Sequence, residues 1–421
     1  MADTALARGE LARGGLMAAA LAFGGLPLYV HAPRYYAEEM GLGLGALGAV
    51  LLAARALDSV QDPVLGWLAD RTRRYREVWA LAAAALLAAG FVVLFAPPGW
   101  GDAPVRLALG LVAAFTGFSA LQIALYDHGL ALARAAGGGH TRVALWREAG
   151  GLVGICLAAM APAVLGAVLG PKAGFLGFAL LFVVVAAVAA GAMAGRWRAS
   201  GAIESAAEGA ASSFRQALET PGVGAMLAFG FVNALPTAVT STLFLFFVGG
   251  VLQAEPHAGP MLLVFFAAAA AAAPFWARLA ARTGRRRTLA LGMSLSIAAF
   301  AWAYALGPGD VAPFYGVALA SGAALGADMT LAPAMLAARI EGGGARVFAL
   351  WTFLQKSALA LAAGVALPLL ALGGFEPGAV DAQGRDALSA AYALVPCFLK
   401  LAAIAMLAVL PVEKERSLAT S

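Results

Sequence analysis

Charged residues and cysteines are both scarce in this chain. Only 12% of the 421 residues are charged and 62% are hydrophobic, whereas about a quarter of a soluble globular domain is charged. So little charge excludes an ordinary soluble domain of this length. The two cysteines, Cys156 and Cys397, lie alone in separate apolar stretches, which excludes a disulfide framework and a cysteine-based metal site.

Motifs for nucleotide and covalent chemistry are also missing. The glycine-rich stretches lack the GxxxxGK[ST] pattern of phosphate-binding loops. We find no metal cluster and no pairing of a nucleophile with a base, so we expect neither an enzyme nor an ATP-driven pump, and no cofactor. The formal charge of +5 comes from basic residues in short loops, which are typical topology signals and do not indicate a nucleic-acid partner.

Long apolar runs recur along the whole chain. Runs of about 20 residues are long enough to cross a hydrocarbon core of about 30 Å, so we expect an all-α membrane protein surrounded by lipids. The first run follows a short polar segment without a cleavage site, and we interpret it as a retained helix. Twelve transmembrane helices are predicted, at 14–36, 43–68, 77–97, 103–132, 143–168, 173–196, 221–250, 258–281, 287–307, 311–338, 346–373 and 387–411.

The longest polar segment divides these helices into two sets of six. We predict an N-terminal half at 1–196, a cytoplasmic linker at 197–220 and a C-terminal half at 221–421. Most Lys and Arg residues outside the helices fall on the side of the N-terminus. This bias predicts that both termini are cytoplasmic, in a multi-pass protein of a bacterial-type inner membrane. We expect a monomer that carries a small-molecule substrate.

A short repeat supports the division into halves. The stretch "DPVLGWLADRT" at 62–72 is similar to "APFWARLAART" at 273–283, with Pro63 matching Pro274 at an offset of 211 residues. The second and eighth helices are therefore the same element in two related halves, as in transporters built from parallel repeats. At the same offset, Asp58 and Asp62 correspond to alanines, so the scaffold does not need these carboxylates.

Asp58 and Asp62 are the strongest candidates for a functional site. A charge at mid-membrane depth costs roughly 2.5–3.5 kcal/mol on insertion scales. The two residues are four apart and share a helix face, and two carboxylates so close together favour a shared cation or proton. Na⁺ and H⁺ both remain candidates. The alternative is structural, with Arg55 paired to Asp58 and Asp62 bonded to a neighbouring helix.

Several other polar residues within the apolar stretches are expected to face the same interior. Lys356 must meet an anion or water there, whereas Lys400 has either an interior partner or a snorkelling role. For Asp127 and His128 we expect a solvated helix end. The remaining interior candidates are Ser119, Gln122, Tyr126, Arg147, Glu148, Asn233, Thr237, Thr240, Ser241, Asp328 and Thr352.

Four segments carry a resemblance to a known family. These are "ARALDSVQDPVLGWLADRT", "HTRVALWREAGGLVGICLA", "LGADMTLAPAMLA" and "WTFLQKSALALAAG". Together they resemble the glycoside–pentoside–hexuronide:cation symporters of the major facilitator superfamily, typified by melibiose permease. The resemblance covers nearly the whole chain and implies the major facilitator fold, with alternating access to a midplane site.

The resemblance also implies roles for individual residues. Asp58 and Asp62 match the cation-binding carboxylates, and would bind Na⁺ if the protein is sodium-coupled. Gln61, Ser119 and Thr352 match polar residues near that ion. Residues expected on the substrate side are Arg147, Lys356, Gln122, Tyr126, Asn233 and Thr237.

The sequence departs from the sugar permeases at the substrate side. Their sugar-binding carboxylates on the first and fourth helices correspond here to Ala22 and Gln122, and Tyr126 stands at the place of an aromatic platform. The resemblance to the characterised family implies a cation-coupled symporter of a sugar or glycoside, whereas the missing carboxylates favour an amphiphile. Alternatives are a Na⁺-coupled carrier of a lysolipid or other amphiphile and a non-transporting scaffold, although a scaffold has no need of buried charge.

Arginine-rich loops follow the second and eighth helices. In this superfamily such clusters form a cytoplasmic gate with acidic helix ends, which implies gating roles for Asp70, Arg71 and Arg282. Ala281 stands where the second half would need a match for Asp70, so the network is expected to be asymmetric. The alternative is that these arginines serve only as topology signals.

Overall fold

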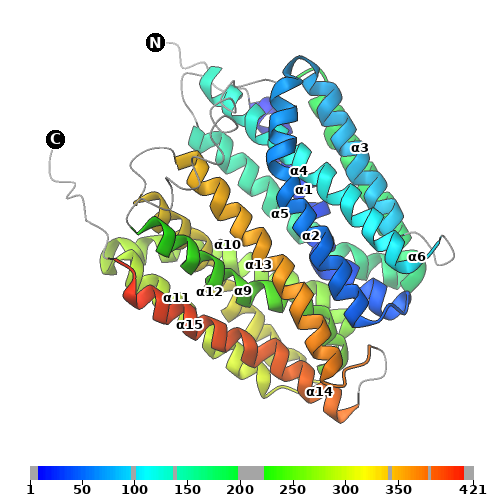
Figure 1. Cartoon of the computed structure of the whole chain (residues 1–421), viewed down its shortest axis with the longest axis vertical. Helices are drawn as coiled ribbons and strands as arrows, with labels where there is room; N and C mark the ends of the chain where they lie inside the picture. Colours follow the sequence, from blue (N-terminus) through cyan, green and yellow to red (C-terminus); the bar gives the residue numbers. More distant parts are fainter. Residues whose placement is uncertain are drawn as a thin grey trace.

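The computed structural model describes residues 8–95, 101–135, 140–197, 222–339, 344–377 and 381–411. It is a bundle of long helices in two groups that lie side by side (Figure 1). The first group contains α1 (Arg8–Arg34), α2 (Leu44–Arg71), α3 (Arg76–Phe95), α4 (Ala103–Ala135), α5 (His140–Leu169) and α6 (Pro171–Met193). The linker predicted at 197–220 lies, apart from its first residue, outside the described residues.

The second group begins after that linker. It contains α9 (Val223–Phe246), α10 (Ala258–Thr283), α11 (Arg285–Tyr304), α12 (Val311–Ala337), α13 (Gly344–Leu372), α14 (Ala382–Ser389) and α15 (Val395–Val409). The last two are joined by the π-helical turn η5 (Ala390–Leu394). Short π-helical turns also extend α1 and α9, as η1 (Tyr35–Glu39) and η3 (Phe247–Val251). Two 3₁₀ turns, η2 (Arg73–Tyr75) and η4 (Glu255–His257), precede α3 and α10.

The predicted fold of twelve transmembrane helices is confirmed. Among the described residues, eleven helices are long and apolar enough to span a membrane. The remaining predicted span coincides with α11, whose hydropathy is lowered by serines and by the three arginines of its first turn. Such helices suit a bilayer because all their backbone hydrogen bonds are made within the segment.

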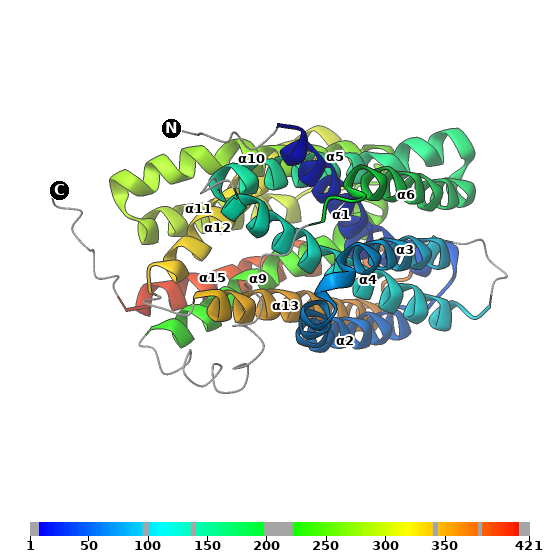
Figure 2. The same cartoon turned by 90° about the horizontal axis from the view of Figure 1, so that it is seen from above.

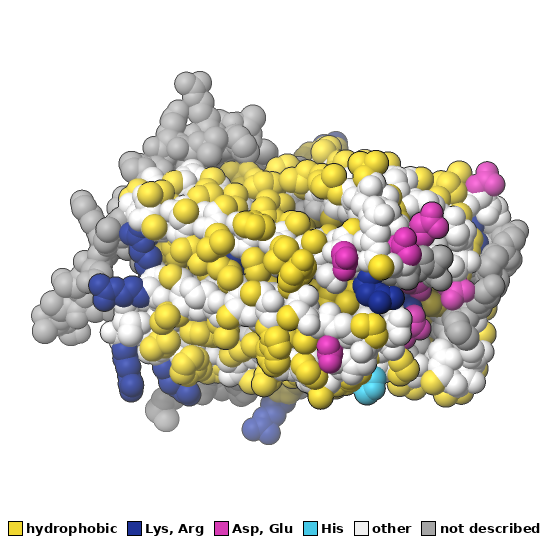
Figure 3. Space-filling view, turned by 90° about the horizontal axis from the view of Figure 1, so that it is seen from below, with side chains coloured by type: hydrophobic (Ala, Val, Ile, Leu, Met, Phe, Trp, Pro, Cys, Tyr) yellow, Lys and Arg dark blue, Asp and Glu magenta, His cyan; other side chains and the backbone are white. Residues whose placement is uncertain are grey.

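Charge is separated between the two ends of the bundle. We call the end where α1 begins and α15 ends the terminal end, and the other the opposite end. In Figure 3 an apolar surface lies between basic side chains gathered toward one end and acidic side chains toward the other. Arg71, Arg282 and Arg285 lie at the terminal end, and Glu38, Glu255 and Asp381 at the opposite end.

Small residues let helices of one half approach closely. A Cβ atom added to Gly150 of α5 would lie 2.0 Å from the Gly15 oxygen of α1, and one added to Gly154 would lie 2.1 Å from the Ala19 oxygen. No side chain fits at either position. Without a hydrophobic driving force between helices in lipid, this close backbone packing stabilises the α1–α5 pair.

The two halves meet along three helix pairs. α2 packs against α13, α5 against α10, and α1 against α9, and Figure 2 shows α2 beside α13 from above. The first of these pairs matters most for the site, because it brings Asp58 and Asp62 of one half beside Lys356 of the other.

Candidate functional site

The predicted acidic residues of α2 lie in a polar cluster between the two halves, where Asp58 is buried and Asp62 partly buried. Asp58 is 3% exposed, and its Oδ1 accepts hydrogen bonds from Ser119 of α4 at 3.1 Å and from Gln61 at 3.3 Å. Four residues apart on one helix face, Asp58 and Asp62 direct their carboxylates toward α4 and α13. The sequence-predicted grouping of Asp58, Gln61, Asp62 and Ser119 is therefore present in the structure.

Lys356 of α13 is the positive centre of this cluster. Its Nζ lies 2.5 Å from Asp62 Oδ2 and 3.3 Å from Asp58 Oδ2, and it also donates a hydrogen bond to Ser119 Oγ at 3.1 Å. The prediction that this amine lies within reach of the two aspartates is confirmed. Because α13 belongs to the second half and α2 and α4 to the first, the ammonium ties the two halves together.

Arg55 supplies a second positive charge at the edge of the cluster. Its guanidinium carbon lies 3.7 Å from the ring centre of Tyr29 and 3.9 Å from that of Phe115, so two aromatic faces hold it by cation–π contacts. Nη1 lies 3.6 Å from Asp58 Oδ2. The structural alternative, in which Arg55 pairs with Asp58 and Asp62 bonds to a neighbouring helix, is thus also consistent with these contacts. The ion-binding role of the two aspartates stays a prediction.

The cluster is electrically balanced but not fully bonded. Arg55 and Lys356 carry two positive charges, and Asp58 and Asp62 two negative charges. Asp62 Oδ1 is buried and has no hydrogen-bond partner within the described part of the chain. A buried polar atom without a partner is costly, so this oxygen is suited to accept a ligand.

One contributor was not predicted from the sequence. Thr116 of α4 donates a hydrogen bond to Gln61 Oε1 at 2.8 Å, which orients the Gln61 amide so that its nitrogen faces Asp58. Thr116 lies three residues before Ser119 and therefore on the same helix face. That spacing is the signal that would have identified it. Thr352, predicted beside the ion, lies one turn before Lys356 on α13 and is exposed.

The predicted substrate-side residues of the first half form a separate group. The Arg147 guanidinium carbon lies 4.1 Å from the ring centre of Tyr126, and Arg147 Nη2 lies 2.8 Å from Glu148 Oε1. Tyr126 is 47% exposed, and Gln122 lies one turn before it on α4, partly buried. The platform is thus a tyrosine covered on one face by an arginine.

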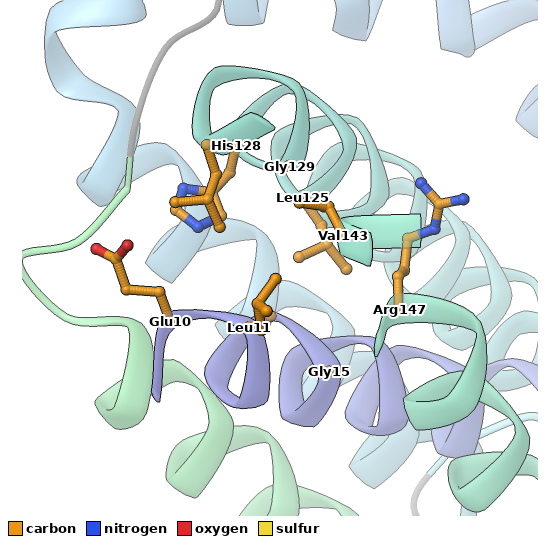
Figure 4. A pocket seen from close by; sticks show the side chains of 10 residues that line it. Glu10, Leu11, Gly15, Leu125, His128, Gly129, Val143 and Arg147 are labelled. Atoms are coloured by element: carbon orange, nitrogen blue, oxygen red, sulfur yellow. The ribbon is translucent and has the colours of Figure 1, made fainter. Parts of the chain in front are cut away.

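A small pocket opens beside this platform, between α1, α4 and α5. Figure 4 shows Glu10 and His128 on one side of it and Arg147 on the other, with Leu11, Leu125 and Val143 between them. Its lining is mostly apolar, with Glu10, His128 and Arg147 as its charged or polar side chains. Asp58 and Asp62 are not among the lining residues, so this pocket is distinct from the buried cluster.

The predicted substrate-side residues of the second half lie in another buried group. Asn233 of α9 accepts a hydrogen bond from Lys400 of α15 at 2.7 Å. Lys400 also lies 2.5 Å from Asp328 of α12, so it has an interior partner and does not snorkel. Thr237 lies one turn after Asn233 and is partly buried.

The expectation of a solvated helix end at Asp127 and His128 is wrong. Both residues are 4% exposed, and Asp127 Oδ2 lies 2.6 Å from Nη1 of Arg76 on α3. Antiparallel packing places the beginning of α3 beside the end of α4, so each charge has a buried partner. The His128 ring packs edge-on against Trp197.

The predicted gating residues show no network within the described residues. Arg71 is exposed, with its guanidinium carbon 5.5 Å from the ring centre of Trp67. Arg282 is exposed on the last turn of α10. Asp70 lies in the last turn of α2, and its side chain is outside the described part of the structure. Their gating roles stay predictions.

An ion pair joins the two halves at the opposite end. Arg34 of α1 donates through Nε to Glu38 Oε2 at 2.6 Å and through Nη2 to Glu255 Oε1 of η4 at 2.5 Å. A Cβ atom at Gly249 would approach Arg34 Nη2 to 3.3 Å, so a glycine leaves room for the guanidinium. We call Arg34, Glu38 and Glu255 the latch.

The twelve helices in two related halves, with buried charge between them, define a multi-pass transporter of the major facilitator superfamily. The family described as MFS/sugar transport protein matches residues 14–414. The chain belongs to this family, which confirms the resemblance found in the sequence.

A curated relative is similar over a short segment. The inner membrane symporter YicJ of Escherichia coli (strain K12) is 49% identical over 39 residues, which are 9% of this chain and 8% of YicJ. So short a match does not carry the substrate of that protein over to this one.

Solved structures share the fold across nearly the whole chain. The nucleoside transporter NupG has a TM-score of 0.71 at 13% identity, covering 94% of this chain and 98% of NupG. Tetrameric PepTSo2 has a TM-score of 0.68 at 13% identity, covering 96% of this chain and 97% of PepTSo2. A bacterial homolog of the human lysosomal transporter Spinster, in an inward-facing conformation, has a TM-score of 0.66 at 13% identity, covering 96% and 95%.

Proposed function

We propose that the protein is a cation-coupled symporter of a small solute that works by alternating access. The single observation that carries this proposal is the contact of Lys356 in one half with Asp62 and Asp58 in the other. An ammonium group there occupies the oxygens that a coupling ion would use. Rocking of one half against the other moves α13 relative to α2 and changes that contact.

The balance of charge in the cluster gives the coupling its physical basis. With two positive and two negative side chains, the site is neutral when Lys356 is seated. A Na⁺ ion or an additional proton makes it positive, which is costly at this depth. The ion therefore binds favourably only when Lys356 moves off the carboxylates, so ion binding and the position of α13 depend on each other.

We propose a sugar or glycoside as the solute, because the chain belongs to a family described by sugar transport. The runner-up is a lysolipid or other amphiphile, favoured by Ala22 and Gln122 at the positions of the sugar-binding carboxylates. Arg147 over Tyr126 suits either cargo, since the pair offers an aromatic face and a cation.

A binding screen separates the two classes of solute. The purified protein is tested by thermal shift against sugars, glycosides and lysolipids, each with Na⁺ and with choline at equal ionic strength. We expect stabilisation by at least one sugar or glycoside, larger with the coupling ion present. Saturable stabilisation by lysolipids with no response to any sugar decides for the runner-up.

We further propose that the termini are cytoplasmic, as the distribution of basic residues favours. Contacts across the halves at the opposite end then close the outer side, and the conformation faces inward. The latch is one of these contacts. Another is the contact between the Ala363 backbone oxygen of α13 and Gly48 of α2, which lie close together.

Replacement of Glu255 by Gln should weaken closure at the opposite end. The Glu255 side chain is 59% exposed, so the pair contributes only about 0.2–1 kcal/mol. That predicts a roughly 1.4-fold to fivefold faster reaction of Ala363→Cys with an impermeant maleimide, in a protein whose own cysteines are serine. Glu38→Gln is the matched control, because Glu38 and Arg34 belong to the same half.

A charge swap gives the decisive outcome for the latch. Arg34→Glu combined with Glu255→Arg should return the labelling rate toward that of the parent, since the attraction across the halves is restored. If this double variant is labelled as fast as Arg34→Glu or Glu255→Arg alone, the contact between Arg34 and Glu255 does not hold the halves together.

A further inference from the structure

The second half contains a buried charged group that the transport scheme does not use. Lys400 of α15 is 1% exposed, and its Nζ donates to Asp328 Oδ2 at 2.5 Å and to Asn233 Oδ1 at 2.7 Å. Asp328 Oδ1 is buried without a hydrogen-bond partner in the described residues. Three helices, α9, α12 and α15, contribute one residue each.

The scaffold of a half does not require this group. In the first half, α6 is the counterpart of α15 and has no charged residue between Ala173 and Met193. The counterpart of α12 is α4, which has none between Leu107 and Tyr126. Over these stretches the related helices therefore pack without charge, and the buried Asp127 of α4 lies just beyond them, paired with Arg76 of α3. The buried charges of the second half are costly in a membrane.

The group repeats the arrangement of the first cluster. In each case a lysine Nζ lies 2.5 Å from one carboxylate oxygen and also contacts a neutral oxygen, Ser119 Oγ in one and Asn233 Oδ1 in the other. In each case one buried carboxylate oxygen is left without a partner in the described residues. Carboxylate and amide oxygens are the ligands that hard cations prefer.

The two lysines differ in how their partners are connected. Lys356 binds residues of the other half, so a rocking motion changes its distance from them. Lys400, Asp328 and Asn233 all belong to the second half, and α15 packs directly on α9 and α11. A rigid-body motion of that half leaves these contacts unchanged, and Lys400 is buried within it.

We propose that Asp328 and Asn233 form a second site for a monovalent cation, which the Lys400 ammonium fills permanently. The lysine is a built-in substitute for an ion, and no second ion binds to the parent protein. Neither α9 nor the stretch of α10 from Ala258 to Ala277 carries a charged residue, so neither offers the Asp328 carboxylate another cation. Removal of the ammonium should therefore turn the group into a Na⁺ site.

The test is equilibrium binding of radiolabelled Na⁺ to the purified protein, with a thermal shift in NaCl against choline chloride. Lys400→Ala leaves space for an ion and should bind one more Na⁺ than the parent. NaCl should also raise its melting temperature by a few degrees more than that of the parent, because only the folded form has the site. The test measures the Na⁺ bound in addition to that of the parent, so its result does not depend on whether the first cluster binds Na⁺ or H⁺.

The matched control is Lys400→Ala combined with Asp328→Asn, which removes the carboxylate as well. This double variant should return to the Na⁺ stoichiometry of the parent. A folded Lys400→Ala protein that gains no Na⁺ overturns the proposal. The proposal is also wrong if Lys400→Ala fails to fold at every Na⁺ concentration while the double variant folds. In that case Na⁺ cannot replace the lysine as the partner of the Asp328 carboxylate.

Discussion

Asparagine in place of Asp62 or Asp58 should abolish the response of the purified protein to its coupling ion. Each change keeps the size of the side chain but removes a negative charge, leaving Lys356 and Arg55 in excess. Loss of a charged ligand costs about 1.5–3 kcal/mol, which corresponds to roughly 10-fold to 150-fold weaker binding. We expect the Na⁺-dependent thermal shift, or its pH dependence if the ion is a proton, to disappear.

Glu148→Gln is the matched control for these variants. Glu148 is an exposed carboxylate that contacts Arg147 and lies outside the cluster, so the ion response should persist when it is neutralised. If Asp58→Asn and Asp62→Asn both respond to the ion as the parent does, the two aspartates serve only to pair Arg55 and Lys356. The structural alternative would then be correct.

Lys356→Met should bind the coupling ion more tightly and yet fail to transport. Methionine has nearly the length of lysine but no charge, so it stops competing for the oxygens of Asp58 and Asp62. We expect the apparent ion affinity to rise by about tenfold or more, as removal of a competing buried charge predicts. Uptake of the solute found in the screen should be lost, because ion binding no longer depends on the position of α13.

Lys356→Arg separates charge from shape at the same position. The guanidinium keeps the positive charge but is larger and planar and does not release its proton. We expect folded protein with ion affinity near that of the parent and impaired transport. Unchanged ion affinity in Lys356→Met would contradict the idea that the lysine and the ion share one site.

The sequence was most informative where charge interrupts an apolar helix. Asp58 and Asp62 stand out because each costs insertion energy, and their spacing of four places them on one face of α2. The pairing with Lys356 was also predictable, since a buried ammonium needs an anion. Helix positions followed from hydropathy, because a bilayer demands a fixed length of apolar chain.

Partners contributed by packing were harder to predict. The seating of Arg55 between Tyr29 and Phe115 depends on how α1 and α4 approach α2, and no local pattern shows it. From the sequence, Lys400 could either pair with an interior residue or snorkel, because a lysine near a helix end can extend to water. Only the arrangement of α9, α12 and α15 shows that Asp328 and Asn233 bind the Lys400 ammonium group.

Asp127 shows where reasoning from one helix fails. It lies in the last part of α4, and ends of membrane helices are usually solvated. The prediction ignored Arg76, which lies 51 positions earlier in the sequence but is brought to Asp127 by antiparallel packing of α3 and α4. Expected exposure near a helix end must therefore be checked against charges at the near end of the neighbouring helix.

Coupled movement of ion and solute in reconstituted vesicles tests the proposed function most directly. Vesicles with equal ion concentrations on both sides are given an inward gradient of the solute that stabilises the purified protein. A symporter must then carry radiolabelled Na⁺, or protons detected by a pH-sensitive dye, inward with the solute, and Asp62→Asn must not. Inward movement of the solute with no accompanying Na⁺ or proton would contradict cation coupling.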